Sequence, residues 1–250
     1  MTSPFNRRTA LAGLAALATG ACSKVADSPT GRTLSKAAEG WHRRAHRKLA
    51  SRQALAREYE KADISPDFKG NGTIRISEES YQAELEAGFS SWQLEVRGLV
   101  DNPMSLTMDD IRALPQRTQI TRHDCVEGWS AIGEWTGPQL SEVLDAAKVQ
   151  EGANFIIFRC ADSFKQGAYY ESVDMVDAYH PQTIIAHMLN GEAIPQKNGA
   201  PLRMRIERQL GYKHAKFLTA IEAVASLDDI GLGKGGYWED HHGYQWYAGI

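Results

Sequence analysis

Apolar and polar residues alternate along several short stretches of the chain, a period of two that is typical of half-buried β-strands. Five stretches follow this pattern or form an apolar run of strand length: 92–98, 117–124, 154–160, 202–206 and 217–225. The stretch 154–160 is almost wholly apolar, so we expect it in the centre of a sheet.

Short helices are predicted between these strands. Residues 106–115 contain Thr107 as an N-cap, acidic residues in the first turn and a proline at the end. Residues 137–147 begin with a proline in the first turn, and 183–189 are apolar and followed by Asn-Gly. Short strands mixed with short helices, without a regular βαβ order or an internal repeat, indicate an α+β fold.

A longer pattern predicts a helix over residues 36–62. Trp41, Ala45, Leu49 and Ala56 fall near one face of this helix, and basic residues occupy the other faces. Such a basic amphipathic helix could lie on an anionic membrane surface or dock a partner. It could equally pack on the domain as a solvated helix.

The first residues are typical of an export signal rather than of a folded segment. Arg7 and Arg8 precede the apolar run 10–21, which is shorter than the roughly 20 residues that a bilayer requires. This twin-arginine pattern predicts export in the folded state to the periplasm. The run ends at Cys22 in a context similar to a lipoprotein box, so Cys22 could be acylated, although cleavage near Ala21 remains open.

These features divide the chain into an export signal at 1–21, a tether and basic helix at 22–62 and one domain at 63–250. The tether, over 22–35, is rich in Ser, Thr, Gly and Pro. Three cysteines are too few for a disulfide framework. Residues 62–250 carry a net charge of −11, which argues against nucleic acid as a partner.

The stretch 121–137 concentrates groups that could carry chemistry. Cys125 lies there among charged residues, two tryptophans and several glycines, and Arg122 and His123 would favour its thiolate. A thiolate is a nucleophile and a ligand for soft metals, whereas the alternative is a buried structural cysteine. Cys160 could form a disulfide with Cys125 or lie in the core. No C-x-x-C or H-E-x-x-H pattern indicates zinc or iron–sulfur sites.

Two segments resemble a known family. Cys-Val-Glu-Gly-Trp-Ser followed by Trp-Thr-Gly, within 125–137, is similar to the cysteine loop of the sulfite oxidase family of molybdopterin-dependent oxidoreductases. The residues of this loop are similar to those of the bacterial periplasmic branch of the family, which includes the methionine sulfoxide reductase catalytic subunit. Residues 198–203 and 210–216 resemble the family's pterin-phosphate segment. The resemblance covers roughly 64–250 and implies a sulfite oxidase-type molybdopterin-binding fold with mixed sheets and short helices.

This resemblance implies a molybdenum–molybdopterin cofactor, with Cys125 as the metal ligand. Arg203 would bind the pterin phosphate bidentately, and Lys213 and Lys216 would act as point charges. His214 stands where the family has a small hydroxyl residue. The residues expected to bind the cofactor are Phe68, Asn71, Cys125, Cys160, Asn198, Arg203, Lys213, His214, Ala215 and Lys216. Taken singly, the charged ones could be surface residues and the first two could belong to a plain loop.

Catalytic roles are expected for Cys125, Asp124, Arg122 and Tyr170, with Trp129 also in the pocket wall. Ion pairing and aromatic packing are the alternatives for the last four. The aromatics of 236–247 resemble the family's closing segment and are expected to cover the core near the site.

The implied activity is that of a periplasmic molybdenum oxidoreductase, which transfers an oxygen atom and two electrons to or from a small substrate. Haem and immunoglobulin-like domains are not recognised in the chain, so a membrane b-type or soluble c-type cytochrome is expected as the electron partner, and a monomer as the default. Three alternatives remain: a protein methionine sulfoxide reductase subunit, a sulfite dehydrogenase, and a non-catalytic lipoprotein that serves as a binding module.

Overall fold

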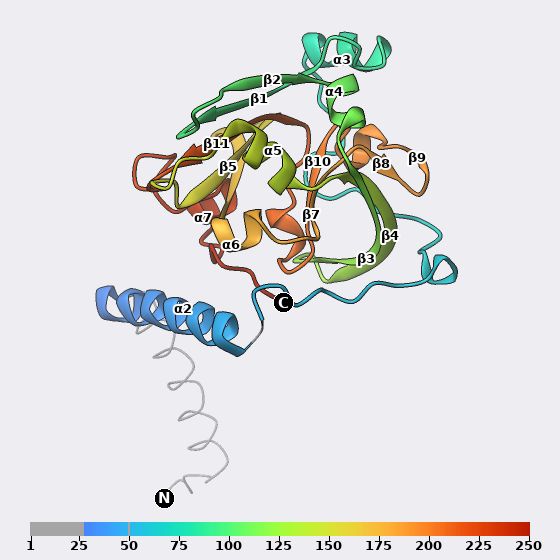
Figure 1. Cartoon of the computed structure of the whole chain (residues 1–250). Helices are drawn as coiled ribbons and strands as arrows, with labels where there is room; N and C mark the ends of the chain where they lie inside the picture. The colour runs from blue at the N-terminus through green and yellow to red at the C-terminus, as the bar shows by residue number, and fades with distance from the viewer. Residues whose placement is uncertain (1–27, 50) are drawn as a thin grey trace, which may run out of the picture. The chain divides into compact units, whose positions relative to one another are not determined.

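The structure, a computed structural model, describes residues 28–49 and 51–250. The chain forms two units, Met1–Ser51 and Arg52–Ile250. The described part of the first unit is dominated by helix α2 (Pro29–Leu49), shown in blue in Figure 1. The predicted export signal and Cys22 lie outside the described residues.

The predicted helix 36–62 is wrong at both ends, because α2 begins at Pro29 and ends at Leu49. The residues that follow bond to the second unit instead of continuing the helix. The amide of Ala56 donates to Gln182 Oε1 over 2.7 Å, and that of Tyr59 donates to the Ile120 carbonyl over 2.8 Å. Ala56 therefore belongs to the body and not to the helix face predicted from its spacing.

A five-stranded sheet forms the centre of the second unit. Its order is β2 (Met104–Thr107), β1 (Gln93–Gly98), β11 (Leu218–Val224), β5 (Phe155–Phe164) and β6 (Gly167–Asp174). The β1–β11 pair is parallel and the other pairs are antiparallel. The predicted strands 92–98, 154–160 and 217–225 are confirmed, and Figure 1 shows β5 and β11 side by side in this sheet.

A second sheet contains the long hairpin of β3 (Gln116–Cys125) and β4 (Trp129–Pro138), extended by β8 (Met188–Leu189) and β9 (Glu192–Ala193). A separate two-stranded sheet pairs β10 (Arg203–Ile206) with β7 (Thr183–Ala186). The predicted strands 117–124 and 202–206 are thus confirmed. The predicted helix 183–189 is wrong, because Thr183, Ile184 and Ile185 are β-branched and fully paired with β10.

Short helices cover the sheets. The Thr107 hydroxyl caps α4 (Met108–Ala113) by accepting the Asp110 amide over 3.2 Å, as predicted. Helix α5 (Leu140–Ala147) begins at Leu140, because the proline expected to open it ends β4 instead. The remaining helices are α3 (Glu79–Glu86), α6 (Met175–Ala178), α7 (Tyr237–His242) and the 3-10 turns η1 (Lys61–Asp63), η2 (Gln196–Asn198) and η3 (Gly211–Lys213).

Two apolar clusters fill the body. The larger one packs α3, α4 and α5 against the five-stranded sheet, with Leu94, Ile156 and Ile221 fully buried. The smaller one includes Phe68 and Trp135 and lies under the hairpin. This α+β arrangement agrees with the predicted fold class. Among the described residues, no helix combines the length and hydropathy needed to cross a bilayer.

Candidate functional site

Cys125 ends β3 at the tip of the β3–β4 hairpin. It pairs with Trp129 across the turn, and its carbonyl accepts the Gly128 amide over 3.0 Å. Gly128 has a φ of +87°, a conformation that favours glycine, so the tight turn explains this residue of the motif. The thiol is free and buried, and burial raises its pKa although the Glu127 amide opposes the rise. The turn therefore presents one protonated thiol at a fixed position.

Strand alternation separates the charged residues of this motif into two faces. Thr121, His123 and Cys125 point inward and are buried. Arg122 and Asp124 point to the other face, where the Arg122 Nε donates to Asp124 over 3.0 Å. The predicted catalytic roles of Arg122 and Asp124 therefore remain predictions, and neither residue lines the cavity beside Cys125.

That cavity has an empty volume of about 640 Å³ and opens to solvent. Five separate segments line it, within 71–73, 125–127, 162–169, 211–216 and 238–244, so it exists only in the folded chain. The lining residues are Asn71, Gly72, Thr73, Cys125, Val126, Glu127, Asp162, Phe164, Tyr169, Gly211, Tyr212, His214, Lys216, Trp238 and Tyr244. The aromatics of the C-terminal segment thus form part of the wall, as expected from the sequence.

Arg203 is fully buried beneath this cavity. Its Nη1 donates to the Asn198 carbonyl over 3.1 Å and its Nη2 to Asn71 Oδ1 over 3.4 Å, while its guanidinium lies 5.3 Å from the Trp135 ring. Its Nε has no hydrogen-bond partner in the described part of the chain. Burial, together with the nearby Arg205 charge, lowers the pKa of Arg203 to about 9. A buried cation with a spare donor is arranged to receive an anion.

Lys216 pairs with Arg203 through an isolated backbone bridge and lines the cavity. Its Nζ donates to the carbonyls of Asn71 and Thr73 over 2.5 Å each. Burial, reinforced by the Arg203 charge, lowers the pKa of Lys216 to about 7. Among the ion pairs of the described residues, none includes Arg203 or Lys216. Two buried cations therefore share one region without a carboxylate bonded to either.

His123 lies at the inner edge of the same region. Its Nδ1 is 3.0 Å from Arg205 Nη1, and a guanidinium can only donate, so neutral His123 carries its proton on Nε2. That Nε2 is buried and has no hydrogen-bond partner among the described residues. A Cβ on Gly211 would come within 2.4 Å of this ring, so only glycine lets η3 approach it. Burial, together with Arg203, lowers the pKa of His123 well below its usual value.

Arg205, unlike Arg203, is neutralised within the chain. It bonds to Glu207 through Nε over 2.9 Å and Nη2 over 2.6 Å. His214 lines the cavity, and its Nε2 lies 3.1 Å from the Gln209 carbonyl, which fixes Nδ1 as a free acceptor in the neutral ring. Burial and Arg205 lower the pKa of His214 well below its usual value. The nearby rings of His123 and His214 are therefore uncharged.

The other predicted cofactor residues lie around this region at different depths. Asn71 lines the cavity, whereas Asn198 and Phe68 lie behind it, where Asn198 Nδ2 donates to the Phe68 carbonyl over 3.2 Å. Ala215 is buried and accepts the Met204 amide. Cys160 is a free thiol on β5 that does not line the cavity, and burial raises its pKa. A cofactor contact through Phe68, Cys160 or Ala215 stays a prediction.

Lys213 is occupied elsewhere. Its Nζ lies 2.6 Å from Glu171 and 2.6 Å from Glu239, and all three side chains are buried. Burial alone would lower the pKa of Lys213, but the two carboxylates raise it overall. Burial, added to the Glu239 charge, raises the pKa of Glu171 well above its usual value. Sequence spacing placed Lys213 and Lys216 in one role, but only Lys216 lines the cavity.

Sequence reasoning missed several residues of the cavity wall, of which Tyr169 and Asp162 carry the most chemistry. Tyr169 lines it, with its hydroxyl donating to the Tyr212 carbonyl over 2.8 Å, whereas the predicted Tyr170 points away and donates to Asp240 over 2.5 Å. Asp162 is 4% exposed and lines the cavity with an unpartnered Oδ1, and burial raises its pKa to about 6. The period of two along β5 and β6 could have identified both, once the inward face of each strand was known.

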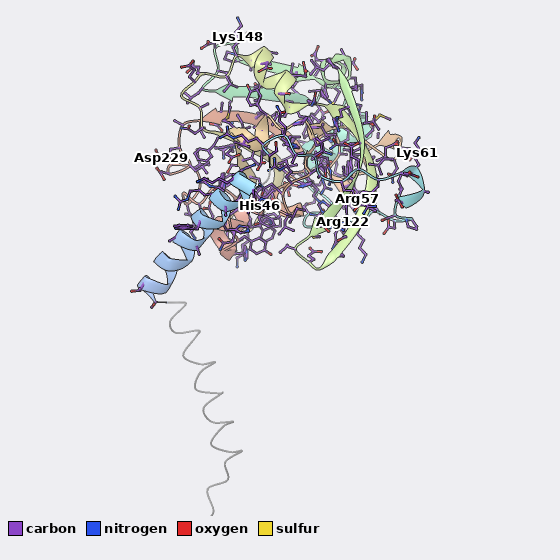
Figure 2. All side chains as sticks on the ribbon, turned by 60° about the horizontal axis from the view of Figure 1, so that its bottom comes forward. His46, Arg57, Lys61, Arg122, Lys148 and Asp229 are labelled. Atoms are coloured by element: carbon purple, nitrogen blue, oxygen red, sulfur yellow. The ribbon has the colours of Figure 1, made fainter. Side chains whose placement is uncertain are left out.

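Arg122 and Asp124 contribute to a second, shallower depression on the other face of the hairpin. Arg57 and Tyr59 also line it, with the Arg57 guanidinium 4.6 Å from the Tyr59 ring. Figure 2 shows Arg57 and Arg122 close together at this face. The structure thus divides the predicted site residues between a buried cationic cavity and an exposed face.

Known proteins resemble this chain over the same region. Residues 82–229 match the oxidoreductase molybdopterin binding domain. A protein of Azospira oryzae, whose name proposes it as a subunit of protein-methionine-sulfoxide reductase, is 41% identical over 164 residues, covering 66% of this chain and 58% of that protein. The protein-methionine-sulfoxide reductase catalytic subunit of Xanthomonas campestris pv. campestris is 32% identical over 151 residues, covering 56% and 47%. The chain thus spans about half the length of these curated relatives.

Among solved structures, the sulfane dehydrogenase SoxCD from Paracoccus pantotrophus superposes with a TM-score of 0.51 and 21% sequence identity. The superposition covers 55% of this chain and 39% of that one. At this identity the likeness concerns the fold alone.

Proposed function

Because this chain belongs to the family of oxidoreductases with a molybdopterin binding domain, we propose that its cavity reduces a neutral sulfoxide, of the methionine sulfoxide class, to the thioether. The family predicted from the cysteine loop and the 198–216 segment is confirmed, and with it the molybdenum–molybdopterin cofactor. The direction of the reaction, its substrate and its partners are inferences of ours.

The residues around the cavity fit this cofactor. A pterin phosphate is an anion, and the region holds two buried cations, Arg203 and Lys216, whose pKa values are lowered and which lack a carboxylate bonded to them. The free Nε of Arg203 and the free Nε2–H of His123 are donors, and the free Oδ1 of Asn198 is an acceptor for a pterin N–H group. The donor set therefore matches an anionic, hydrogen-bonding ligand.

Cys125 is the residue placed to hold the metal. Molybdenum takes soft thiolate ligands, and Cys125 is the free thiol that lines the cavity. Burial raises its pKa, so binding a cation in the cavity is what would release its proton. When bound, the cofactor supplies the exchange of one oxygen atom and two electrons. The rigid hairpin turn keeps Sγ in one place throughout.

The charge of the cavity wall is our reason for proposing a neutral sulfoxide as the substrate and not sulfite. Once a phosphate neutralises the buried cations, the remaining charged wall residues are the carboxyl groups of Glu127 and Asp162. Carboxylates repel a sulfite dianion but tolerate a neutral sulfoxide. Five aromatic side chains complete the wall, which suits the methyl and methylene groups of a thioether: Phe164, Tyr169, Tyr212, Trp238 and Tyr244.

Sulfoxide reduction also consumes protons. A sulfoxide plus two protons and two electrons gives a thioether and one water molecule. Asp162 is the titratable wall residue suited to hold one of these protons, because its pKa is about 6 and its Oδ1 is free. Below that pH the Asp162 carboxyl is protonated and can donate to a ligand oxygen.

We propose the location and the partners on the basis of sequence features. The twin-arginine signal at 1–21 supports export to the periplasm, and the 22–62 segment supports a tether to the membrane, through a lipid on Cys22 or without one. The second unit, Arg52–Ile250, then forms the catalytic body predicted for 63–250, extended by the segment that packs on β3. We propose a separate cytochrome as the electron donor, since the relatives of this chain are named as subunits of their enzymes.

The test is metal and pterin analysis of the exported protein, followed by turnover with a dye as electron donor. We expect one molybdenum and one pterin per chain, and reduction of methionine sulfoxide. Sulfite oxidation in place of sulfoxide reduction would contradict the substrate assignment. A chain that is exported without molybdenum would make it the non-catalytic binding module that the sequence left open.

A further inference from the structure

Helix α2 presents an apolar stripe that is exposed to solvent. Ala38, Trp41, Ala45 and Leu49 are spaced by three or four residues, so they lie on one face of the helix. All four are exposed, Trp41 by 71% and Leu49 by 88%. Trp41 and Leu49, joined by the two alanines into one stripe, mark a surface suited to binding an apolar partner.

Cations flank this stripe. Arg44 is exposed and its guanidinium lies 5.6 Å from the Trp41 ring, and Lys48 is exposed one turn further along. Residues 29–49 contain six Lys or Arg and one Glu. The body, residues 52–250, contains 19 Lys or Arg and 29 Asp or Glu. Positive charge is thus concentrated on α2, in a chain whose other described unit is acidic.

We infer that α2 lies flat on an anionic lipid surface, with its apolar stripe in the acyl boundary and its flanking cations at the headgroups. Tryptophan is enriched at that depth, and Arg and Lys extend from such a stripe toward phosphate groups. The helix is 21 residues long, which gives roughly 30 Å of contact. It cannot cross the bilayer, because its charges and hydropathy exclude a span.

A lipid surface fits better than an acidic protein or the acidic body of the same chain. Acidic protein surfaces would attract the cations but offer no apolar partner for an exposed Trp41 and Leu49. A membrane supplies both an anionic plane and an apolar interior. It would repel the acidic body, which leaves α2 as the part of the chain that is attracted. This inference does not depend on the proposed reaction.

The experiment measures vesicle binding of the loaded enzyme beginning at Ser23, which keeps both described units and omits the apolar run. Vesicles of phosphatidylcholine alone are compared with vesicles that also contain phosphatidylglycerol. We expect binding to the anionic vesicles and far weaker binding to the neutral ones. Hydrogen exchange should slow in residues 29–49 when the anionic vesicles are added.

Two double variants separate charge from apolar contact. Arg44→Gln with Lys48→Gln should weaken anionic binding by about 30-fold, at roughly fivefold per cation. Trp41→Ser with Leu49→Ser should weaken it by at least about tenfold. The matched control removes two exposed cations from the body, Lys61→Gln with Lys165→Gln, and should bind as the unaltered chain does.

Three results would overturn the inference. If the Trp41/Leu49 variant binds as tightly as the unaltered chain, the apolar stripe does not enter lipid. If the body control weakens binding as much as the helix variant, the attraction is not specific to α2. If no vesicle binds and exchange in 29–49 is slow without lipid, α2 packs on protein. Circular dichroism of each variant confirms that α2 remains helical.

Discussion

Two buried lysines, three residues apart, have opposite electrostatic environments, and their pKa values shift in opposite directions. Lys213 is bonded to Glu171 and Glu239 over 2.6 Å each, and its pKa is raised overall. Lys216 is bonded only to carbonyls, and burial lowers its pKa to about 7. Sequence inspection cannot separate them, because both lie in the same seven-residue segment.

This difference indicates that buried Lys213 stabilises the fold, whereas buried Lys216 is available to bind a ligand. The Glu171–Lys213–Glu239 cluster satisfies its cation within the chain, so it needs nothing from outside. The region of Arg203 and Lys216 leaves two cations without an ion pair, a state that burial disfavours. Binding of an anion in this region would therefore stabilise the folded chain. Four experiments test this contrast.

The largest effect is expected for Cys125→Ser, which removes the thiol beside the cationic region without altering either lysine. A serine oxygen is a harder ligand than a thiolate and a poor match for this site. We expect no measurable turnover, a folded protein and pterin still bound. Turnover and pterin content are measured together. Full activity in this variant would show that the metal is held elsewhere.

Lys213→Met should damage the fold itself. It leaves two buried carboxylates without their cation, and breaking a buried ion pair from one side costs about 3–5 kcal/mol. We expect the free energy of unfolding in urea to fall by about this amount, with and without cofactor. A loss of cofactor at unchanged stability would instead place Lys213 among the phosphate ligands, as its spacing suggested.

Lys216→Met is the matched change in the other region. The apoprotein should unfold at an unchanged or higher urea concentration, because a poorly solvated cation is replaced by an apolar side chain. Cofactor retention should fall by about 10- to 150-fold, since a charged hydrogen bond contributes roughly 1.5–3 kcal/mol. Turnover per bound molybdenum should stay near normal. Full molybdenum content would refute the phosphate role of Lys216.

The smallest effect is the pH dependence of apoprotein stability. The unfolded chain keeps Lys216 protonated up to its ordinary pKa of 10.5, whereas the apo fold releases that proton near 7. Between these values the unfolded state binds more protons, so stability should rise with pH, by at most about 1.4 kcal/mol per pH unit. A bound phosphate should abolish this slope.

At lower pH, Asp162 should give the dependence of stability on pH the opposite sign. Its pKa rises from 3.8 to about 6 in the fold, so the folded state binds more protons between those values and stability should fall as pH rises through them. Asp162→Asn should remove this second slope and leave the one above pH 7. Urea unfolding at a series of pH values measures both. A flat profile in the apoprotein would mean that water reaches these groups.

The sequence predicted the elements whose signal is local. Thr107 caps α4 as predicted, and the strands around 92–98 and 217–225 follow their alternation. Errors arose where distant contacts decide. The apolar run 183–189 is compatible with a helix or a strand, and the pairing of 183–186 with β10 makes that part a strand. The pattern of 36–62 extended the predicted helix past Leu49, but the amides of Ala56 and Tyr59 bond to Gln182 and Ile120 instead.

The sequence predicted many of the residue types at the site, but not which of these side chains face the cavity. Of the residues expected to bind the cofactor, Cys125, Asn71, His214 and Lys216 line the cavity and Arg203 lies beneath it, so their roles stay predictions. Tyr170 and Lys213 were also expected at the site, but neither lines the cavity. Alternation along β6 turns Tyr169 toward the cavity and Tyr170 toward Asp240. A one-residue uncertainty along a strand therefore moves a side chain to the opposite face.

The parallel pairing of β1 with β11 determines when the site can come into being. It joins Glu95 to Ala220, so the chain must close a very long loop before the central sheet exists, and such closures are slow steps in folding. The β3–β4 hairpin, in contrast, closes locally and sets the thiol at its tip early. Lys216 lies two residues before β11, so the anion-binding half of the cavity is completed only by that late closure. We therefore expect cofactor binding to follow that closure, and a chain stalled before it would carry a formed cysteine turn with nothing opposite it.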